Sequence, residues 1–471
     1  MDKKKVLLIN PSMMSVYEKS VLKNSFPHYP PLNLLTVAGA LKQNSIPVSL
    51  LDLDLINNRE LTEVLQEKLR EVNPELVGVT FTTTLYSQCV KIAEIIKNYK
   101  KDIIVVAGGS HASSKPEDLI TKTPYDMAVV GEGEFTLAEV MTKPKEQWNT
   151  IKGLVYKGDK GEIIKTEKRP FIKNLDEIPF PMYEIINIYN YNIPPSFRRK
   201  TPTACMETSR GCLWGCTYCN KSVFGRNFRV KSPERTVKEI EQLVSLGYKE
   251  IHIVDDMFTT NKERVKEICR LLIEKNINII WACPNGIRAD RIDRELISLM
   301  KKAGCYRVSI GAESGNQDVL NAIEKNQTPQ QVEVAFKICR ELGMVTHGFF
   351  MFGLPEDTEE TMQQTIEFAK RCEPDIAKFG IMIPLPSTPI YEKWKEKQAI
   401  TENWDDYGFH KEKPVYTHPT LSHETIKKYY KKSYREFYLR PSFIIRRVFR
   451  SLKTGQIFDD IRLVLATNWF S

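Results

Sequence analysis

Short unbroken apolar segments alternate with stretches of helical periodicity over residues 5–140 of this chain. Unbroken apolar strands between helices are typical of a parallel sheet that helices cover on both faces. We therefore expect an N-terminal α/β domain with a doubly wound parallel sheet. The expected strands span residues 6–9, 48–54, 76–81, 103–107 and 127–130, with helices at 32–43, 61–72 and 85–99.

A second series of apolar strands and amphipathic helices begins near residue 203. Six strand–helix units in succession predict a partial (β/α)6 barrel, and in barrels of this kind the active site lies at the carboxyl ends of the strands. The expected strands span residues 204–208, 250–254, 279–282, 307–310, 348–352 and 378–383. Helices are expected at residues 233–246, 262–276, 294–302, 317–323, 329–342 and 359–372.

Between these two series, residues 154–166 read as a hairpin around Gly158 and Gly161, and a proline-stiffened linker follows. The expected domains are 1–145 for the first sheet, 146–200 for a connector, 201–395 for the barrel and 396–471 for a helical C-terminal extension. A chain of 471 residues is long enough for several domains.

Composition narrows the class of protein. The chain is 42% hydrophobic with a net charge of +9, and we find no apolar stretch long enough to span a bilayer. The apolar run at the N-terminus stops at Asn10, which suits a first strand better than a secretory signal. Seven of the ten cysteines are scattered in apolar contexts and suit buried thiols in a reducing compartment. We expect a cytoplasmic protein.

The other three cysteines carry the chemistry. Cys212, Cys216 and Cys219 form a C-x3-C-x2-C motif within eight residues. Three thiolates can hold three irons of a [4Fe–4S] cluster and leave the fourth iron free for a small ligand. A structural zinc site is the alternative, although zinc sites more often show two C-x2-C pairs or nearby histidines.

This motif, with the aromatic Tyr218 before its third cysteine, resembles that of the radical S-adenosylmethionine (SAM) enzymes. The resemblance implies that SAM chelates the free iron. An external reductant such as flavodoxin or ferredoxin would then reduce the cluster, and SAM would split to a 5′-deoxyadenosyl radical. The partial barrel is the fold that the resemblance implies.

The same resemblance assigns SAM contacts at the strand ends. Asp256 is favoured for the SAM amino group, with Asp255 nearly equal to it and a helix N-cap as the alternative role for one of the pair. Glu313 and Ser314 are expected to contact the ribose or methionine part. Gly353 begins the Gly-x-Pro segment that supports adenine.

Arg288 leaves two interpretations open. It follows the third expected barrel strand. At that place it can contact the substrate or the SAM carboxylate, or form a salt bridge within its own loop.

The N-terminal sheet resembles the Rossmann-like cobalamin-binding domain of one large radical SAM class. The matching segments are 29–34, the Gly-Gly-Ser-His of 108–111 and the Gly-Glu-Gly-Glu of 131–134. The chain has no Asp-x-His motif, so no histidine is expected below the cobalt. His111 is expected to touch the cobalamin tail or a carboxamide, with a plain loop histidine as the alternative. The implied cobalamin residues are Asn10, Thr82, Gly108, Gly109, His111, Gly131 and Gly133.

The C-terminus is basic, with ten Lys or Arg against two Glu in residues 421–455. One interpretation is a helical cap with a solvated basic face. The other is an amphipathic helix that makes peripheral contact with the inner membrane surface, close to a lipid substrate. No nucleic-acid partner is expected, because no RNA-binding module is recognisable.

Together these features predict a radical SAM enzyme that most resembles cobalamin-dependent methyltransferases of unactivated carbon. The alternative is oxidative cyclisation or rearrangement of a tetrapyrrole- or lipid-like substrate, as in the anaerobic magnesium-protoporphyrin monomethyl ester cyclase. A non-catalytic iron–sulfur protein is a remote alternative. The substrate is expected to be a small molecule or a lipid, and the sequence assigns no catalytic residue.

Overall fold

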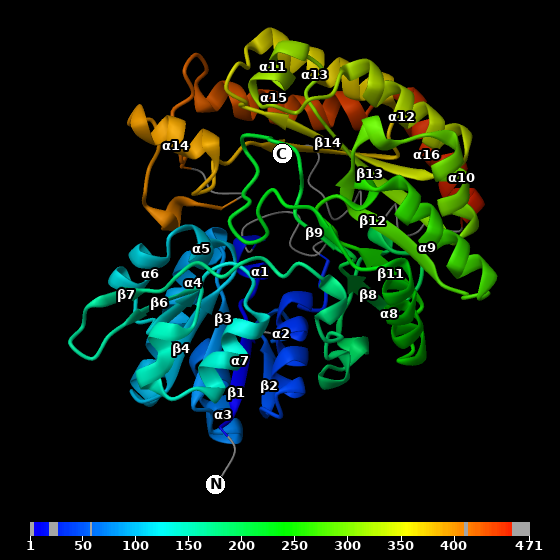
Figure 1. Ribbon diagram of the computed structural model, residues 1–471. Helices are drawn as coiled ribbons and strands as arrows, with labels where there is room; N and C mark the ends of the chain where they lie inside the picture. Colours follow the sequence, from blue (N-terminus) through cyan, green and yellow to red (C-terminus); the bar gives the residue numbers. More distant parts are fainter. Residues whose placement is uncertain (1–3, 18–26, 57–58, 409–412, 455–471) are drawn as a thin grey trace.

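A computed structural model describes residues 4–17, 27–56, 59–408 and 413–454 (Figure 1). The predicted α/β fold with two parallel sheets is confirmed. The last part of the expected C-terminal extension, residues 455–471, lies outside the described residues.

The N-terminal sheet has the strand order β2-β1-β3-β4-β5-β6-β7. Its first five strands in this order are parallel, and the expected hairpin adds β6 and β7 as antiparallel strands at one edge. The hairpin therefore belongs to the sheet rather than to a free connector. The strands are β1 (Val6–Asn10), β2 (Val48–Asp52), β3 (Leu76–Thr80), β4 (Ile104–Gly108), β5 (Met127–Val129), β6 (Leu154–Lys157) and β7 (Ile163–Lys165).

Neighbouring residues of each strand point to opposite faces of the sheet. Here both sets of side chains are apolar, so both faces of the sheet are apolar. Leu7 and Ile9 of β1 pack under α3 (Leu61–Val72) and α4 (Tyr86–Tyr99). On the other face, Val6 and Leu8 pack under α2 (Leu32–Gln43) and α7 (Glu134–Thr142). Short helices α1 (Met14–Tyr17), α5 (Ser110–Ser114) and α6 (Pro116–Lys122) follow strand ends.

The second sheet is the predicted six-stranded parallel one, in the order β15-β14-β13-β12-β11-β8. Its strands are β8 (Thr203–Met206), β11 (Glu250–Ile253), β12 (Ile280–Ile287), β13 (Cys305–Glu313), β14 (Val345–Phe352) and β15 (Ile376–Ile381). The helices are α8 (Pro233–Ser245), α9 (Lys262–Glu274), α10 (Arg294–Lys302), α11 (Gln317–Ala322), α12 (Pro329–Glu341) and α13 (Glu359–Cys372). Figure 1 shows the helices outside the curved sheet.

One predicted strand end is wrong. The strand expected to stop at residue 282 continues as β12 to Ile287. Pro284 and Gly286 indicated a break, but a register irregularity between Cys283 and Ile287 absorbs both residues while pairing with β13 resumes. The loop expected at residues 283–287 is therefore part of the barrel wall.

The C-terminal extension closes one edge of the barrel sheet. It consists of α14 (Pro389–Glu396), α15 (His423–Tyr438) and α16 (Pro441–Thr454). From α15, the Tyr438 hydroxyl donates to the carbonyl of Ala377 and accepts from its N–H, and Tyr434 bonds both backbone groups of Phe379 in the same way. These tyrosines satisfy the free edge of β15. Among the described helices, none has both the length and the apolar character to cross a bilayer.

Candidate active site

The cysteine loop is held at both ends by a small antiparallel ladder. Strand β9 (Ser209–Arg210) pairs with β10 (Arg229–Val230), so residues 211–228 form a loop between them. Gly211 has φ +79°, and a Cβ there would lie 2.3 Å from the carbonyl oxygen of Asn227. Only glycine fits this turn, which places Cys212 directly after the ladder.

The three thiols of this loop share one environment. Cys212 and Cys216 are partly exposed and Cys219 is exposed. Burial by the surrounding loop raises the pKa of Cys219 to about 11, and the charge of Lys221 opposes this rise. Thiols that influence one another and stay open to a ligand suit binding to a metal centre.

The donor set of this loop consists of thiols. Cys212, Cys216 and Cys219 are free cysteines that are at least partly exposed, so all three are available as metal ligands. Each cysteine of a cluster binds a different iron, and three such ligands leave the fourth iron free for SAM. The donor set therefore fits a [4Fe–4S] cluster.

The two acids after β11 are separated by the structure. Asp255 is buried and accepts hydrogen bonds from the Thr208 N–H at 2.6 Å, the Thr208 hydroxyl at 2.6 Å and the Ser209 hydroxyl at 2.5 Å. Asp256 is exposed, and its charge raises the pKa of Cys219. The geometry therefore leaves Asp256 free to meet a ligand beside the thiols, while Asp255 fixes the turn from β8 into β9.

A buried lysine joins two of the predicted SAM residues. Lys325 Nζ lies 2.6 Å from Glu313 Oε1 and 3.4 Å from the hydroxyl of Tyr218. Glu313 has φ +61° at the end of β13, and a Cβ on Gly311 would come within 2.6 Å of its carboxylate. The sequence analysis missed Lys325, because this residue lies after α11 and belongs to no recognisable motif. The structure thus gathers Tyr218, Lys325 and Glu313 beside the cysteine loop.

Two further residues at the barrel mouth make contacts within the protein. The buried hydroxyl of Ser314 lies 3.2 Å from Thr365 Oγ1 and accepts from the Asn316 N–H at 3.2 Å, and its expected contact with SAM stays a prediction. Arg288 forms the salt bridge within its loop, with Nε 2.7 Å from Asp290. Its guanidinium also lies 4.4 Å from the ring centroid of Trp214 and supports the cysteine loop.

Gly353 lies where β14 meets the C-terminal extension. It has φ +73°, and a Cβ would lie 2.3 Å from the hydroxyl of Tyr416, which donates to the Gly353 carbonyl at 3.0 Å. Its expected role under adenine stays a prediction.

Polar side chains also line the carboxyl edge of the N-terminal sheet. Asn10 Nδ2 donates to Asp52 Oδ1 at 2.8 Å, and the buried Asp52 carboxylate also faces the hydroxyl of Tyr191. Burial raises the pKa of Asp52 to about 6. Thr82 and Gly108 lie at the same edge, and a Cβ on Gly108 would meet nothing within 4 Å. The edge therefore offers polar side chains and, beside Gly108, room for a ligand to approach the backbone closely.

His111 lies among aromatic rings. It is fully buried at the start of α5, with Nδ1 3.0 Å from the hydroxyl of Thr83. Its ring stacks on Phe81 and meets the edge of Trp404, with centroid distances of 5.1 and 5.3 Å. Burial lowers its pKa to about 4. Its Nε2 is buried without a hydrogen-bond partner among the described residues, and the expected contact with cobalamin stays a prediction.

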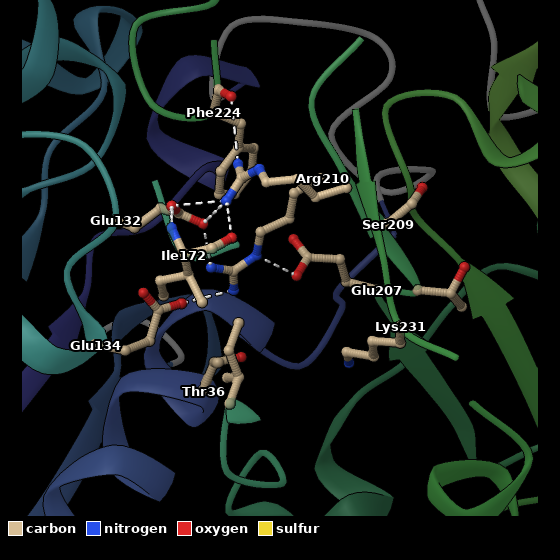
Figure 2. A network of polar contacts seen from close by, with 12 residues as sticks. Thr36, Glu132, Glu134, Ile172, Glu207, Ser209, Arg210, Phe224 and Lys231 are labelled. Carbon is tan, nitrogen blue, oxygen red and sulfur yellow. Dashed lines mark hydrogen bonds and ion pairs between the residues drawn. The ribbon is translucent and has the colours of Figure 1, made fainter. Parts of the chain in front are cut away.

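The two carboxylates of the Gly-Glu-Gly-Glu segment, Glu132 and Glu134, meet the guanidinium of Arg210 (Figure 2). Arg210 is 3% exposed and pairs with Glu132 at 2.8 Å, Glu134 at 2.6 Å and Glu207 at 2.6 Å. Arg229 pairs with Glu132 at 2.8 Å. We call these five residues the carboxylate–arginine network. It fastens the N-terminal domain to the ladder that holds the cysteine loop.

The cysteine loop also contacts the N-terminal domain directly. Asn220 Nδ2 donates to Ser114 Oγ at 3.0 Å, and the Ser222 hydroxyl donates to the Ser110 carbonyl at 3.3 Å. A Cβ on Gly131 would lie 3.7 Å from the carbonyl oxygen of Val223. The cysteines therefore lie against the strand ends that carry the predicted cobalamin residues.

Comparison with known proteins agrees with both halves of this site. Residues 206–369 match the family model of the radical SAM superfamily, and residues 19–141 match that of the B12 binding domain. An uncharacterized methyltransferase of Pyrococcus horikoshii is 32% identical over 94% of this chain and 95% of its own length. The chain belongs to the radical SAM superfamily. The anaerobic magnesium-protoporphyrin IX monomethyl ester cyclase of Rubrivivax gelatinosus is 26% identical, over 88% of this chain and 75% of that protein.

Solved structures of radical SAM enzymes share the fold. The cobalamin-dependent radical enzyme OxsB, with aqua-cobalamin and SAM bound, has a TM-score of 0.73 at 18% identity, covering 98% of this chain and 72% of its own. The methyltransferase TsrM from Kitasatospora setae, with tryptophan and a SAM analogue bound, has a TM-score of 0.69 at 20% identity, covering 92% and 83%. At these identities the likeness shows the fold alone.

A radical SAM enzyme with a B12 binding domain uses a [4Fe–4S] cluster, SAM and cobalamin. The residues present fit these groups: three free thiols in one loop, an exposed carboxylate beside them, and an unobstructed backbone approach at Gly108 on the carboxyl edge of the first sheet. The non-catalytic alternative is set aside, because the chain is a member of an enzyme superfamily.

Proposed function

We propose that this radical SAM enzyme is a cobalamin-dependent methyltransferase that acts on an unactivated carbon. The observation that carries the proposal is the direct contact between the cysteine loop and the strand ends of the B12 binding domain, made by Asn220 on Ser114 and Ser222 on Ser110. When bound, cluster and SAM supply a 5′-deoxyadenosyl radical, and cobalamin carries the methyl group. Methyl transfer to carbon requires these two sites to face one substrate.

The chain's own residues orient and shield the reactants. Asp256 receives the SAM amino group beside the thiols, while Glu313, held by Lys325, faces the rest of SAM. Tyr218, Ser314 and Gly353 complete the proposed SAM contacts. Trp214 of the cysteine loop lies against the guanidinium of Arg288, which supports the loop.

On the other side, the proposed cobalamin contacts lie along the carboxyl edge of the first sheet, where ligands of such sheets bind. The proposed domain limits are 1–145, 146–200, 201–395 and 396–471, and the hairpin of the connector supplies two edge strands of the first sheet. The proposed cobalamin residues are Asn10, Thr82, Gly108, Gly109, His111, Gly131 and Gly133.

Oxidative cyclisation is the second candidate, and the likeness to the Rubrivivax gelatinosus cyclase supports it. The two reactions differ in their products. Methyl transfer yields S-adenosylhomocysteine together with 5′-deoxyadenosine, whereas cyclisation yields 5′-deoxyadenosine without S-adenosylhomocysteine.

The test is anaerobic reconstitution with iron, sulfide and hydroxocobalamin, followed by gel filtration, metal analysis and quantification of both SAM products after reduction. We expect about four irons and about one cobalt per chain, and both products together. Iron without cobalt would overturn the methyltransferase proposal and leave the radical SAM core standing. Cobalt with 5′-deoxyadenosine alone would favour cyclisation.

We also propose two partners. A flavodoxin or ferredoxin would supply the electron for the cluster. The second partner is an anionic membrane surface, which would contact α16 rather than α15, because the aromatic residues of α15 pack against β15. One face of α16 exposes five large apolar side chains, namely Ile444, Ile445, Val448, Phe449 and Leu452.

The opposite face of α16 is anchored on the barrel. Phe443 is buried, and Arg446 pairs with Glu373 at 3.0 Å. The apolar face thus points away from the protein, and the cationic charge of residues 421–455 complements anionic lipid. In flotation with vesicles of phosphatidylcholine and phosphatidylglycerol, the wild type should bind and Phe449→Asp should lose binding at least tenfold. Val334→Asp, which alters an exposed valine on α12, is the matched control. Equal binding of Phe449→Asp and wild type would overturn this contact.

A further inference from the structure

The inner face of the barrel carries two cations that point away from the helices. On β13, Val308 and Ile310 belong to the apolar core under the helices. Arg307 and Ser309 alternate with these two residues along the strand and therefore face the interior. On β15, Ala377 and Phe379 belong to the same core, so Lys378 faces the interior too.

Neither cation has a carboxylate partner. Arg307 is 2% exposed, its Nε is buried without a hydrogen-bond acceptor, and its Nη2 lies 3.5 Å from the imidazole of His252. Among the described residues, neither Arg307 nor Lys378 lies within 4.0 Å of a carboxylate oxygen, and the buried hydroxyl of Ser309 also has no partner. A buried charge without a counter-ion is costly, so this cluster requires an explanation.

Glu250, an acid at the start of β11, already uses both of its carboxylate oxygens in other hydrogen bonds. Glu250 Oε1 lies 2.7 Å from His252 Nε2 and accepts from the Tyr306 hydroxyl at 2.6 Å. Its Oε2 accepts from the backbone N–H groups of Arg199 and Lys200, each at 2.7 Å. Glu250 therefore has no free lone pair directed at the two cations.

Lys378 lies between two aromatic rings. Its Nζ lies 4.5 Å from the ring centroid of Phe197 and 5.6 Å from that of Phe349. Its side chain keeps access to solvent, while the protein atoms around it and the charge of Arg307 lower its pKa to about 8. The ammonium group is therefore accessible to a ligand that also carries an apolar part.

Strand register fixes the position of Lys378 relative to the proposed SAM residues. Lys378 pairs with Phe349, which pairs with Gly311, two residues before Glu313. Lys378 therefore lies about one row of strand pairs below the proposed SAM contact, with Arg307 deeper still.

We propose that Lys378 and Arg307 bind an anionic group of the substrate, a carboxylate or a phosphate, with Phe197 and Phe349 against its apolar part. This inference rests on the proposed function and names the substrate class for the same site. An oxyanion supplies the acceptor lone pairs that Arg307 Nε and Ser309 Oγ lack, and charge-assisted hydrogen bonds are the strongest available to it. The reacting carbon would then lie above, towards the cysteine loop.

The test is binding of three probes to the anaerobically reconstituted enzyme by titration calorimetry: 3-phenylpropionate, phenylphosphate and the neutral 3-phenylpropanamide. The variants are Lys378→Met and, as matched control, Lys337→Met, which alters an exposed lysine on α12. We expect at least one anion to bind the wild type and Lys337→Met equally, and at least tenfold more weakly to Lys378→Met. The amide should bind at least tenfold more weakly than the propionate, and the stronger of the two anions identifies carboxylate or phosphate.

Protection of Lys378 from reductive methylation, measured by peptide mass spectrometry, gives a second readout in the wild type. The preferred anion should slow modification of Lys378 and leave that of Lys337 unchanged. The inference is overturned if no anion binds the wild type, if the amide binds as tightly, or if Lys378→Met binds like the wild type. Iron and cobalt contents of the same samples decide the proposed function separately, because the wild type can load both cofactors and still fail to bind an anion.

Discussion

The two parallel sheets of this enzyme use their faces differently. In the N-terminal sheet both faces are apolar and covered, and polar groups such as Asn10 and Asp52 appear only where the strands end. In the barrel sheet only the outer face is apolar, while the inner face carries Arg307, Ser309 and Lys378. An open sheet can therefore present a ligand at its edge alone, whereas a curved sheet can also enclose one.

The largest effect should come from a change in the cysteine loop. This change tests whether the cluster site and the cobalamin site can bind their metals independently. Cys216→Ala should abolish iron binding and formation of 5′-deoxyadenosine, because three thiolates are needed to hold the cluster. Cobalt binding, measured by the visible spectrum after reconstitution with hydroxocobalamin, should persist in this variant. Loss of both metals would mean that the two edges form one inseparable site. Cys339→Ala, at a buried cysteine of α12, is the control and should keep its iron.

The next effect concerns the seam, which is the contact that the carboxylate–arginine network makes between the N-terminal domain and the barrel. Arg210→Met removes the partner of three carboxylates in the carboxylate–arginine network and should lower the free energy of unfolding by about 3–5 kcal/mol. Denaturant unfolding of the apoprotein measures it. Arg59→Met breaks only an exposed pair with Glu67 and should leave the free energy of unfolding nearly unchanged. Similar costs for the two variants would show that the seam is not held by this network.

A smaller effect sharpens the description of the first sheet's edge. Because the folded pKa of His111 is about 4 and the ordinary value is 6.5, the unfolded chain binds more protons between these values. The contribution of His111 is thus present above pH 6.5 and is lost as the pH falls towards 4, by about 3 kcal/mol.

His111→Phe should remove this loss, so its stability relative to the wild type should rise by about 3 kcal/mol between pH 7 and pH 4. The comparison with the wild type is needed because Asp52, whose pKa is raised to about 6, has the opposite dependence. A relative stability that stays constant over this pH range would show that the imidazole is not enclosed in solution.

The smallest effect concerns the free edge of the second sheet. Tyr438→Phe removes the hydroxyl that bonds both backbone groups of Ala377 and should cost about 1–2 kcal/mol in denaturant unfolding. Tyr189→Phe, at a tyrosine that is 75% exposed, should change stability by less than about 0.5 kcal/mol. If both variants unfold alike, α15 does not protect the edge of β15.

The sequence was sufficient for the strands, because parallel strands covered on both faces leave continuous apolar segments. It was also sufficient for the cysteine motif, whose spacing indicates a three-cysteine metal site, and the resemblance to radical SAM enzymes implies the cluster. It misplaced the end of β12, because Pro284 and Gly286 are ordinarily breakers and the register shift that tolerates them is a property of the paired strand.

Long-range contacts explain the remaining misses. Arg210 and Glu132 are 78 residues apart, and nothing local to either residue indicates a shared ion pair. Lys325 meets Tyr218 across 107 residues. His111 follows two glycines and reads as a loop residue, yet Trp404 from the C-terminal extension closes over it. In each case the burial of the side chain depends on a domain that the local pattern does not describe.

The seam has a consequence for how turnover can proceed. Buried ion pairs and two direct hydrogen bonds fasten the cysteine loop to the B12 binding domain, so the two modules cannot separate without leaving charges unpaired in the interior. Under the proposed function, we therefore expect the cluster and the cobalamin to stay at one fixed spacing during turnover, while the substrate and the products exchange.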